Sequence, residues 1–434
     1  MKTIAAIDIG TTKIVAVTGK NVGENKVEVL AVGKHNSIGV ERGVVYNVEK
    51  AANSIKKALD NLYLSNDEKI NEVWVGIAGQ HVRSLKSGST LNFDNEEHEI
   101  EIEDIEKLLK ESFSINTSPN EKVVNVAPQS FEINSGISRK IPIGEKSNYL
   151  KANFHLTIAQ TNAFNNIEES LEDNNLKSKE LILESIASAR SVLTKEEIRE
   201  GVALIDIGGG TSDLAIFKND SVVHSAVIPF GGEVVTSDIE KAFNVEKRYA
   251  ETLKLQYGNL FPNSNSDNQI VLKNKEGNKI KVKQSDLTFV IKSRIQEIID
   301  LIQFQIELSG YTNKIPKGIV LTGGGALLKD LTQLYAFHFK NMEIKIGKPN
   351  KQFFSGEFEK NLNEPIFSTV AGLLLIGIDD EKYNKQQQEL IEKQNNKKKL
   401  DIDDSTPKKE KENTFSIFRR RLGSMFNEED NTLD

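Results

Sequence analysis

Residues 201–217, GVALIDIGGGTSDLAIF, decide the fold, because they combine the pattern of a buried strand with a turn built almost entirely of glycine. An apolar run of strand length ends at Asp206, and a second apolar run follows the turn, which is typical of a β-hairpin. Glycine lets backbone N–H groups approach an anion. We therefore predict a phosphate-binding tip, with Asp206 holding a metal-bound water; the alternative is an ordinary tight hairpin. The predicted phosphate contacts are Gly208, Gly209, Gly210 and Thr211.

A second stretch, residues 4–17 (IAAIDIGTTKIVAV), repeats this arrangement near the start of the chain. Lys13 adds a positive charge that can reach a β- or γ-phosphate. A duplication about 200 residues apart is too long for a solenoid and suits two halves of one nucleotide-binding fold. We predict that Asp8, like Asp206, contacts Mg²⁺ through water. The other predicted contacts of this copy are Gly10, Thr11 and Thr12.

A third glycine turn lies in residues 317–331, KGIVLTGGGALLKDL, where a strand ends and a helix is expected to begin. Bare backbone and a helix N-terminus can meet a flat or anionic ligand. Neither GxGxxG nor GxxxxGK[ST] is present, which excludes the Rossmann and P-loop patterns. Two Asp-Gly-Thr hairpins followed by this turn resemble the phosphate 1, phosphate 2 and adenosine motifs of the actin, hexokinase and DnaK-type chaperone superfamily. The resemblance implies an α/β, actin-like ATPase fold of two duplicated ribonuclease-H-like halves that bind ATP. It places Gly323, Gly324, Gly325 and Leu328 on the adenosine side.

Composition indicates a soluble globular chain of more than one domain: of 434 residues, 38% are hydrophobic and 27% charged. The net charge of -7 argues against general nucleic-acid binding. No cysteine is present, which excludes disulfides and thiolate metal sites and fits a reducing cytoplasm. Neither a signal peptide nor a spanning helix is expected from the hydropathy pattern.

An inserted α+β module narrows the resemblance to one family. Between residues 83 and 162, strand-like segments surround a helix expected at residues 102–113. A module at this place resembles subdomain 1C of FtsA, the actin-like cell-division protein. The stretches VIPFGGEVVTSDIEKAF (227–243) and PIFSTVAGLLLIG (365–377) are also similar to this family. For part of the first stretch, the alternative is simply a helix capped by Thr236 or Ser237.

The resemblance divides the chain into subdomains with predicted limits. These are subdomain 1A at 1–82 and 163–200, 1C at 83–162, 2A at 201–244 and 305–380, 2B at 245–304, a disordered linker at 381–413 and an amphipathic helix at 414–427.

Two further site assignments rest on the resemblance. A helix expected at residues 245–257 places Glu251 and Lys254 on one face, and in actin-like proteins such a pair contacts ribose and adenine. The alternative is a surface salt bridge. Glu184 stands where filament-forming relatives carry an acid that orients the attacking water, although it can equally just end a strand. Hydrolysis is expected to be slow at most, carried by positioning and Mg²⁺.

Partners follow from the same resemblance. In FtsA, subdomain 2B receives the acidic C-terminal peptide of the ring protein FtsZ, which suggests Lys292 and Arg294 on the helix expected at residues 286–308. Exposed basic residues on a helix usually only solvate it, and that is the alternative. Self-assembly into filaments and contacts of subdomain 1C with later division proteins are implied as well.

The last part of the chain, residues 414–427, is again rich in apolar residues after the polar linker at 381–413. At 100° per residue its apolar side chains fall within an arc of about 100°, with arginines beside or opposite them. We expect a membrane-surface helix, and the resemblance to FtsA implies that it lies on the cytoplasmic face at the division site. Docking onto a protein is the alternative. The side chains involved are Phe415, Phe418, Arg419, Arg420, Arg421, Leu422, Met425 and Phe426.

The sequence therefore predicts an FtsA-like, ATP-binding protein that polymerises and links the FtsZ ring to the membrane. Two other functions stay open: an actin-like adaptor of pilus assembly, and a small-molecule kinase of the same superfamily. A kinase needs a catalytic acid in a substrate cleft, and the terminal helix counts against both.

Overall fold

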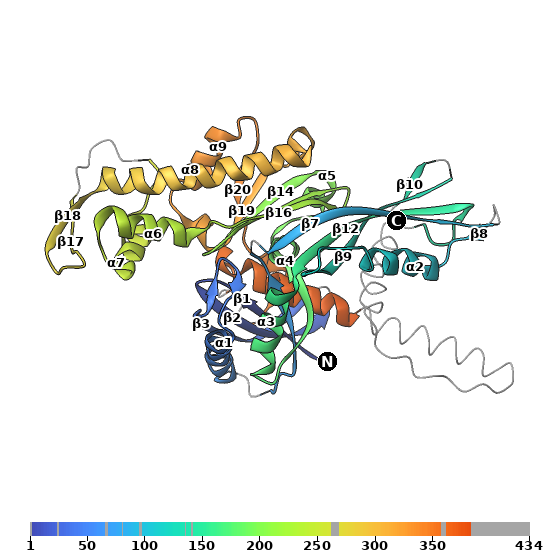
Figure 1. Ribbon diagram of the computed structural model, residues 1–434, viewed down its shortest axis with the longest axis horizontal. Helices are drawn as coiled ribbons and strands as arrows, with labels where there is room; N and C mark the ends of the chain where they lie inside the picture. The colour runs from blue at the N-terminus through green and yellow to red at the C-terminus, as the bar shows by residue number, and fades with distance from the viewer. Residues whose placement is uncertain are drawn as a thin grey trace.

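The computed structural model describes residues 2–382, apart from gaps at 24–25, 66–67, 80, 95–97, 135, 140–141, 262–268 and 357–361. Figure 1 shows an elongated molecule, with the inserted module at one end of the long axis. At the other end lies the hairpin of β17 (Gln269–Lys273) and β18 (Lys279–Lys283). The two sheets of the duplicated halves lie between them. The predicted membrane helix and nearly all of the predicted linker lie outside the described residues.

The first half is built on a six-stranded sheet with the order β13-β6-β1-β2-β3-β21. Strands β1 (Thr3–Ile9), β2 (Lys13–Gly23) and β3 (Lys26–Asn36) form an antiparallel meander. Strand β6 (Glu72–Ile77) is parallel to β1, and β13 (Lys177–Leu183) is parallel to β6. The central strand, TIAAIDI, is almost wholly buried, as expected of a strand covered on both faces.

Helices and short strands complete this half. Helix α1 (Val48–Tyr63) buries Ala51, Ile55, Ala58 and Leu62, which recur at helical spacing. Its first turn is capped by Asn47, whose side chain accepts the N–H of Lys50. The other elements are β4 (Val40–Glu41), β5 (Val44–Val45) and α3 (Thr161–Glu172).

The second half repeats this topology in a five-stranded sheet with the order β16-β15-β14-β19-β20. Strands β14 (Val202–Ile207), β15 (Ser212–Lys218) and β16 (Ser221–Ile228) form the meander. Strand β19 (Ile319–Thr322) is parallel to β14, and β20 (Ile344–Ile346) is parallel to β19. The two meanders with their parallel neighbours confirm the predicted duplication.

Helices pack against the second sheet and extend beyond it. The long helix α8 (Gln284–Ser309) buries one apolar side in the core of this half and follows the β17–β18 hairpin directly (Figure 1). The remaining elements are α5 (Lys195–Glu200), α6 (Gly232–Phe243), α7 (Lys247–Thr252), the π-helix η1 (Leu253–Tyr257), β17 (Gln269–Lys273), β18 (Lys279–Lys283), the 3₁₀-helices η2 (Thr312–Lys314), η3 (Gly324–Leu327), η4 (Lys351–Phe353) and η6 (Pro365–Phe367), and α9 (Leu331–His338).

The inserted module is a four-stranded sheet, β10-β9-β12-β7, with helix α2 (Ile102–Phe113) on one face. The helix has the predicted limits, and Ile105, Leu108 and Leu109 bury its apolar side against the strands. The strands are β7 (Val82–Asn92), β9 (Glu121–Ile133), β10 (Ile137–Arg139) and β12 (Tyr149–Gln160), beside the pair β8 (His98–Glu99) and β11 (Lys146–Ser147). The long strands reach β16 of the second half.

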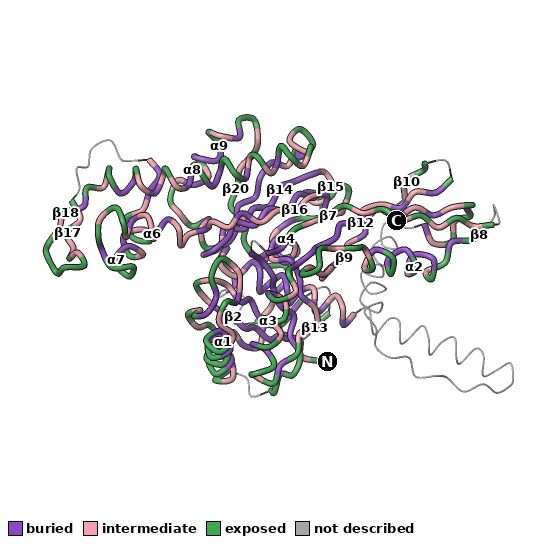
Figure 2. Tube along the Cα trace, viewed as in Figure 1, coloured by how far each residue is buried: buried purple, intermediate pink, exposed green. Residues whose placement is uncertain are grey.

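Two helices cross between the halves, α4 (Glu184–Val192) and a helix at residues 368–382. Their backbones are so close that a Cβ on Gly372 would lie 1.7 Å from the carbonyl oxygen of Ala187. Small residues at this crossing therefore join the two halves. The tube of Figure 2 is buried through this central region and exposed toward its ends.

The last described residues return to the first half, which differs from the predicted assignment of 305–380 to the second half. Strand β21 (Phe354–Ser355) pairs with β3, and helix 368–382 packs on β1 and β2 through Leu374 and Ile378. The helix also extends into the predicted linker, as far as residue 382. Arg190 of α4 forms a bidentate pair with Asp379 of this helix. No helix within the described residues combines the length and apolarity needed to cross a bilayer.

Candidate functional site

The tips of the two duplicated hairpins touch each other. A Cβ on Gly209 would lie 2.4 Å from Thr12 Cγ2, and a Cβ on Gly210 would lie 2.3 Å from Thr11 Oγ1. These distances are too short for any side chain, so glycine at both positions permits the contact. The structure thus brings the two predicted phosphate-binding tips together, one from each half.

The glycine loop of β14–β15 is anchored through its carbonyl groups. The N–H groups of Gly232 and Glu233, at the start of α6, donate to the carbonyls of Gly208 (2.9 Å) and Gly209 (2.7 Å). The N–H of Gly208 donates to the carbonyl of Thr211 at 2.9 Å. The N–H groups of Gly209 and Gly210 make no hydrogen bond to the described part of the chain. They remain available to an anion.

Four acids surround the contact of the two tips. Asp8 and Asp206 are the next-to-last residues of β1 and β14, and Asp213 lies opposite Asp206 in the register of the second hairpin. Glu184 is the first residue of α4 and is half-buried, with its Cγ 3.1 Å from a Cβ built on Gly76. The cluster therefore combines acids from both halves and from the helix that joins them.

Burial raises the pKa of every acid in this cluster. The pKa of Asp8 rises to about 6, chiefly by desolvation, with a smaller upward effect of Asp206. The pKa of Asp213 rises to about 8 because of burial and the neighbouring acids. The pKa values of Asp206 and Glu184 are raised by burial as well. The site is thus short of positive charge.

Hydroxyl groups hold two of these acids in place. Ser188 and Thr369 donate to Asp206 Oδ2 at 2.5 and 3.2 Å, and Thr211 donates to Asp213 Oδ2 at 2.7 Å. Ser188 is on α4 and Thr369 on helix 368–382, so both crossing helices contact the acid of the second hairpin.

Lys13 is the predicted cation of the first hairpin. Its Nζ donates to the carbonyl of Ile366 and lies 5.3 Å from the ring centroid of Phe367. Burial lowers the pKa of Lys13, and Asp8 opposes this effect. Its ammonium group therefore stays near the first acid while being tied to the segment before helix 368–382.

The arrangement fits a divalent cation held through water. Among the described residues, no group of three His, Cys, Asp or Glu side chains has the spacing of a direct metal site. Asp213 Oδ1 is buried and has no hydrogen-bond partner, and the acids raise one another's pKa values. A hydrated Mg²⁺ would supply the missing charge and would be held by Asp8, Asp206 and Asp213.

On the predicted adenosine side, Glu251 and Lys254 share a face and form an ion pair of 2.8 Å. Lys254 also donates to the carbonyl of Gly232 (2.9 Å) and to Thr236 (2.8 Å). The pair thus lies against the helix that anchors the glycine loop. Lys254 belongs to the π-helix η1, a form that is frequent at functional sites.

The predicted cap of the neighbouring helix is wrong. Helix α6 begins at Gly232 with Gly231 as its N-cap, five residues before Thr236, the cap considered from the sequence. Thr236 is buried inside the helix and donates to Glu251. Ser237 is likewise within the helix. A helix that starts at Gly232 can donate its first N–H groups to the glycine loop, which explains the earlier start.

The third glycine turn packs on the end of β14. A Cβ on Gly323 would lie 2.2 Å from Asp206 Oδ1, and one on Gly325 would lie 2.2 Å from Ile207 Cγ2. The turn continues as the 3₁₀-helix Gly324–Leu327 rather than as an α-helix. Leu328 is extended and Asp330 is left-handed, so α9 starts only at Leu331.

The predicted partner-peptide residues lie on α8, and Arg294 Cζ is 5.9 Å from the ring centroid of Phe230. Arg294 is 22% exposed and forms a bidentate pair with Asp238 of α6, with a further pair to Glu297. Lys292 Nζ lies 4.7 Å from the ring centroid of Phe261. Arg294 is therefore already engaged within the protein.

Sequence reasoning missed Asp213 of the acid cluster and the two hydroxyl groups that contact Asp206. Asp213 follows the recognised glycine turn directly, and its place opposite Asp206 could have been found by pairing the hairpin. Ser188 and Thr369 carry no such signal, because they reach Asp206 only through the crossing of two helices distant in sequence.

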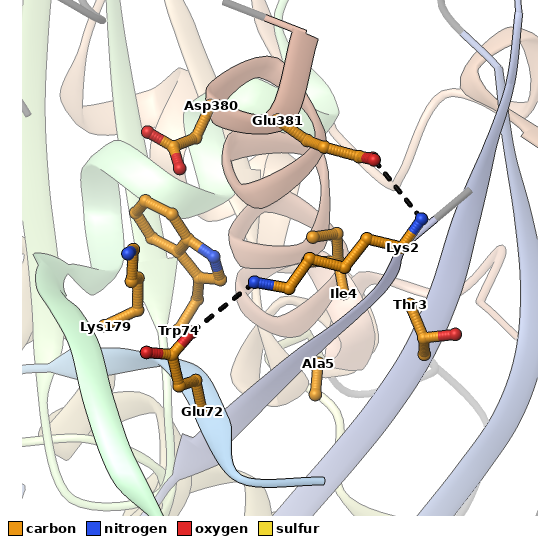
Figure 3. Close-up of a pocket in the computed structure, with 9 residues that line it drawn as sticks. All are labelled: Lys2, Thr3, Ile4, Ala5, Glu72, Trp74, Lys179, Asp380 and Glu381. Atoms are coloured by element: carbon orange, nitrogen blue, oxygen red, sulfur yellow. Dashed lines mark hydrogen bonds and ion pairs between the residues drawn. The ribbon is translucent and has the colours of Figure 1, made fainter. Parts of the chain in front are cut away.

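A small cavity of about 70 Å³ lies at the other end of β1. Figure 3 shows Lys2, whose Nζ pairs with Glu72 and whose backbone N–H donates to Glu381, beside Trp74. None of the predicted site residues lines this cavity. It is therefore separate from the hairpin tips.

Comparisons with known proteins agree with this architecture. Residues 203–372 match the model of the family "Cell division protein FtsA", and residues 79–158 match that of the SHS2 domain inserted in FtsA. The FtsA of Pseudomonas aeruginosa is 34% identical over 88% of this chain and 90% of its own length.

Solved structures are similar in fold alone. The PilM–PilN type IV pilus biogenesis complex has a TM-score of 0.61 at 16% identity, covering 86% of this chain and 98% of the other. MreB5 of Spiroplasma citri bound to ADP has a TM-score of 0.53 at 16% identity, covering 90% and 99%. The actin-like fold is thereby confirmed, and the match to the inserted SHS2 domain confirms the inserted module.

Proposed function

Because this chain belongs to the FtsA family of cell division proteins, we propose that it binds ATP with Mg²⁺ between its halves, polymerises, and tethers the FtsZ ring to the cytoplasmic face of the membrane. The observation that carries the nucleotide part is the contact of the two hairpin tips. Each half supplies one tip and at least one acid, so a ligand between them contacts both halves. Its binding is then coupled to their relative orientation.

Different residues of the site are proposed to contact the phosphates and the Mg²⁺. The N–H groups of Gly209 and Gly210 face the phosphates, and Lys13 supplies a point charge. Asp8, Asp206 and Asp213 hold the hydrated Mg²⁺, which neutralises the phosphates when bound. ADP in MreB5, a protein of the same fold, supports a nucleotide here.

Glu184 is assigned the role of a water-orienting residue by the family resemblance. It begins α4 beside the acid cluster, and burial together with the neighbouring acids raises its pKa well above the usual range. A carboxyl group that is held neutral is a poor base, which accords with hydrolysis that is slow at most. We therefore assign Glu184 a positioning role and treat nucleotide mainly as a switch for assembly.

The membrane part rests on residues 414–427, which lie outside the described residues. Five large apolar side chains at about 1.5–3 kcal/mol each and arginines at about 1 kcal/mol each give a gross attraction of roughly 10–18 kcal/mol. Partial burial and helix ordering offset much of this. A single copy is then a weak, reversible anchor, and a filament multiplies it through avidity.

Sedimentation with liposomes that contain anionic lipid tests the tether. The full chain should sediment with the liposomes, and a deletion of residues 415–426 should leave it in the supernatant. Phe337→Ser, which removes an aromatic ring that is 67% exposed on α9, is the matched control and should sediment like the parent chain. Retention of the deletion variant on liposomes would refute the membrane assignment.

Binding of the acidic C-terminal peptide of FtsZ tests the partner. The proposed adaptor should bind this peptide with Lys292 contributing, and it should show no phosphoryl transfer to a sugar or carboxylate. The likeness to PilM is one of fold alone, at 16% identity. Absence of peptide binding by the polymerised chain would contradict the division role.

A further inference from the structure

The turn between β4 and β5 lies against both hairpin tips. The N–H of Gly43 donates to Thr11 Oγ1 at 2.9 Å, on the tip of the first half. The Cα of Arg42 lies 2.7 Å from a Cβ built on Gly210, on the tip of the second half. This turn therefore forms a third wall where the two tips meet.

Arg42 occupies this wall with an uncommon backbone. Its φ of 49° lies in the left-handed region, which is costly for a residue with a Cβ and which glycine or asparagine adopts more readily. Backbone strain of this kind clusters at functional sites. An arginine is thus retained where the local conformation favours a smaller residue.

The guanidinium of Arg42 is not neutralised by the protein. Its side chain is exposed, and within the described chain it forms no ion pair with a carboxylate. Its Cζ lies 5.9 Å from the ring centroid of Phe230, which directly precedes the start of α6 in the second half. The guanidinium of Arg42, a residue of the first half, therefore lies near a residue of the second half, beside the hairpin tips.

The charges of the site leave room for one more cation. Lys13 is the predicted cation beside Asp8, Asp206 and Asp213, because the other predicted cationic contact, Lys254, is paired with Glu251. A nucleoside triphosphate adds further negative charge. The charges of one Mg²⁺ and one lysine do not balance the negative charge of the acids and the triphosphate together. An arginine adds a positive charge with two parallel donors suited to phosphate oxygens.

We propose that Arg42 binds the terminal phosphate of the nucleotide and makes the site prefer ATP over ADP. The proposal rests on the nucleotide site proposed above and adds a contact that none of the three glycine motifs contains. Because the β4–β5 turn touches both tips, a contact of Arg42 with the terminal phosphate couples the presence of that phosphate to both halves.

Calorimetric titration of the full chain with ATP or ADP, each with Mg²⁺, tests this role. The test variant is Arg42→Asn, because asparagine tolerates the left-handed backbone and lacks the charge. Arg42→Lys keeps the charge without the paired donors. Arg199→Asn, at an exposed arginine on α5 distant from the tips, controls for loss of one positive charge.

Arg42→Asn should weaken ATP binding about 10- to 100-fold and ADP binding less than about threefold, because a hydrogen bond to a charged group is lost. Arg42→Lys should fall between Arg42→Asn and the parent, and Arg199→Asn should match the parent. An unchanged ratio of ATP to ADP affinity in Arg42→Asn overturns the proposal, and so does an equal loss for both nucleotides. A parent chain that binds neither nucleotide instead refutes the proposed nucleotide site itself.

Discussion

At the scale of residues, the acid cluster lowers the stability of the fold and at the same time favours the binding of a cation. Asp8, Asp206 and Asp213 are all buried, and each has a raised pKa. Acids buried together cost free energy unless they are protonated or paired. Such a cost is expected where a site awaits a positively charged ligand. Stability and binding therefore make opposite demands on these positions.

Asp213→Asn tests this conflict. The pKa of Asp213 rises from 3.8 to about 8 on folding, so the proton it retains stabilises the fold at low pH and the benefit is lost as the pH rises through about 8. Asparagine keeps an acceptor for Thr211 and has no charge. We expect the variant to exceed the parent in unfolding free energy by about 1–4 kcal/mol at pH 8 and by little at pH 4.

Urea unfolding of the ligand-free protein at both pH values measures this difference. The same difference at pH 4 and pH 8 would show that Asp213 does not titrate as the structure indicates. Thr211→Val serves as a control, because it removes the hydroxyl donor and leaves the acid in place.

The close contact of the tips gives a second prediction at this scale. In Gly210→Ala the new methyl group meets Thr11 Oγ1 at 2.3 Å, and overpacking of this kind costs about 1–3 kcal/mol. In Gly208→Ala the nearest atom is the Thr211 carbonyl oxygen at 3.4 Å. Thermal unfolding should show a lower midpoint for Gly210→Ala than for Gly208→Ala; equal midpoints would mean that the tips do not touch in solution.

At the scale of elements, the inserted module is fastened to both halves. Its chain ends join the first half, while its strands bond to β16 of the second. Ser84 Oγ donates to the carbonyl of Ser225 (2.6 Å), and Gln129 Nε2 donates to that of Val222 (2.7 Å). His155 adds a contact of 3.0 Å to Ser225 Oγ. A rotation between the halves must consequently shift the module against one of them.

The double variant Ser84→Ala with Gln129→Ala tests this fastening. Two hydrogen bonds at about 1 kcal/mol each are lost, so hydrogen exchange of β16 should accelerate about 10- to 30-fold while the first sheet is unaffected. Ser130→Ala is the control, because its hydroxyl contacts Asn153 within the module. Acceleration spread evenly over the whole chain would argue against a local fastening.

Helix α8 gives a prediction about the partner peptide. Arg294 already bridges α8 and α6 through Asp238, whereas Lys292 lies beside the ring of Phe261 and forms no ion pair with any of the described residues. We expect Lys292→Gln to weaken binding of the acidic peptide at unchanged stability. Arg294→Gln should lower the unfolding free energy by about 1–3 kcal/mol, because it leaves Asp238 unpaired. Fluorescence anisotropy measures peptide binding by the two variants, and urea unfolding measures their stability. The assignment of Lys292 to the peptide site would be contradicted if both variants lost peptide binding equally and neither lost stability.

At the scale of the whole molecule, local motifs predicted much of the architecture. Both hairpins, the third glycine turn and helix α2 follow from residues adjacent in sequence, and the structure has them at the expected places. The start of α6 was not predictable in this way, because Gly231 and Gly232 resemble a turn and Thr236 resembles a cap. Its true start depends on the carbonyls of a distant loop.

Contacts between distant segments account for the remaining differences. Helix 368–382 returns to the first half, since its apolar residues pack on the face of β1 and β2, which lie far from it in sequence. The same crossing brings Thr369 to Asp206. Resemblance to a family supplied the roles of the terminal helix and the partner peptide, which stay predictions.

The central claim is that nucleotide lies between the two hairpin tips, and hydrogen exchange of the full chain with and without ATP and Mg²⁺ tests it most directly. The account predicts slower exchange on ligand addition at the amides of Gly209 and Gly210 and in residues 10–13, because free N–H groups become hydrogen-bonded to phosphate. Bound ATP with unchanged exchange at both tips would contradict it.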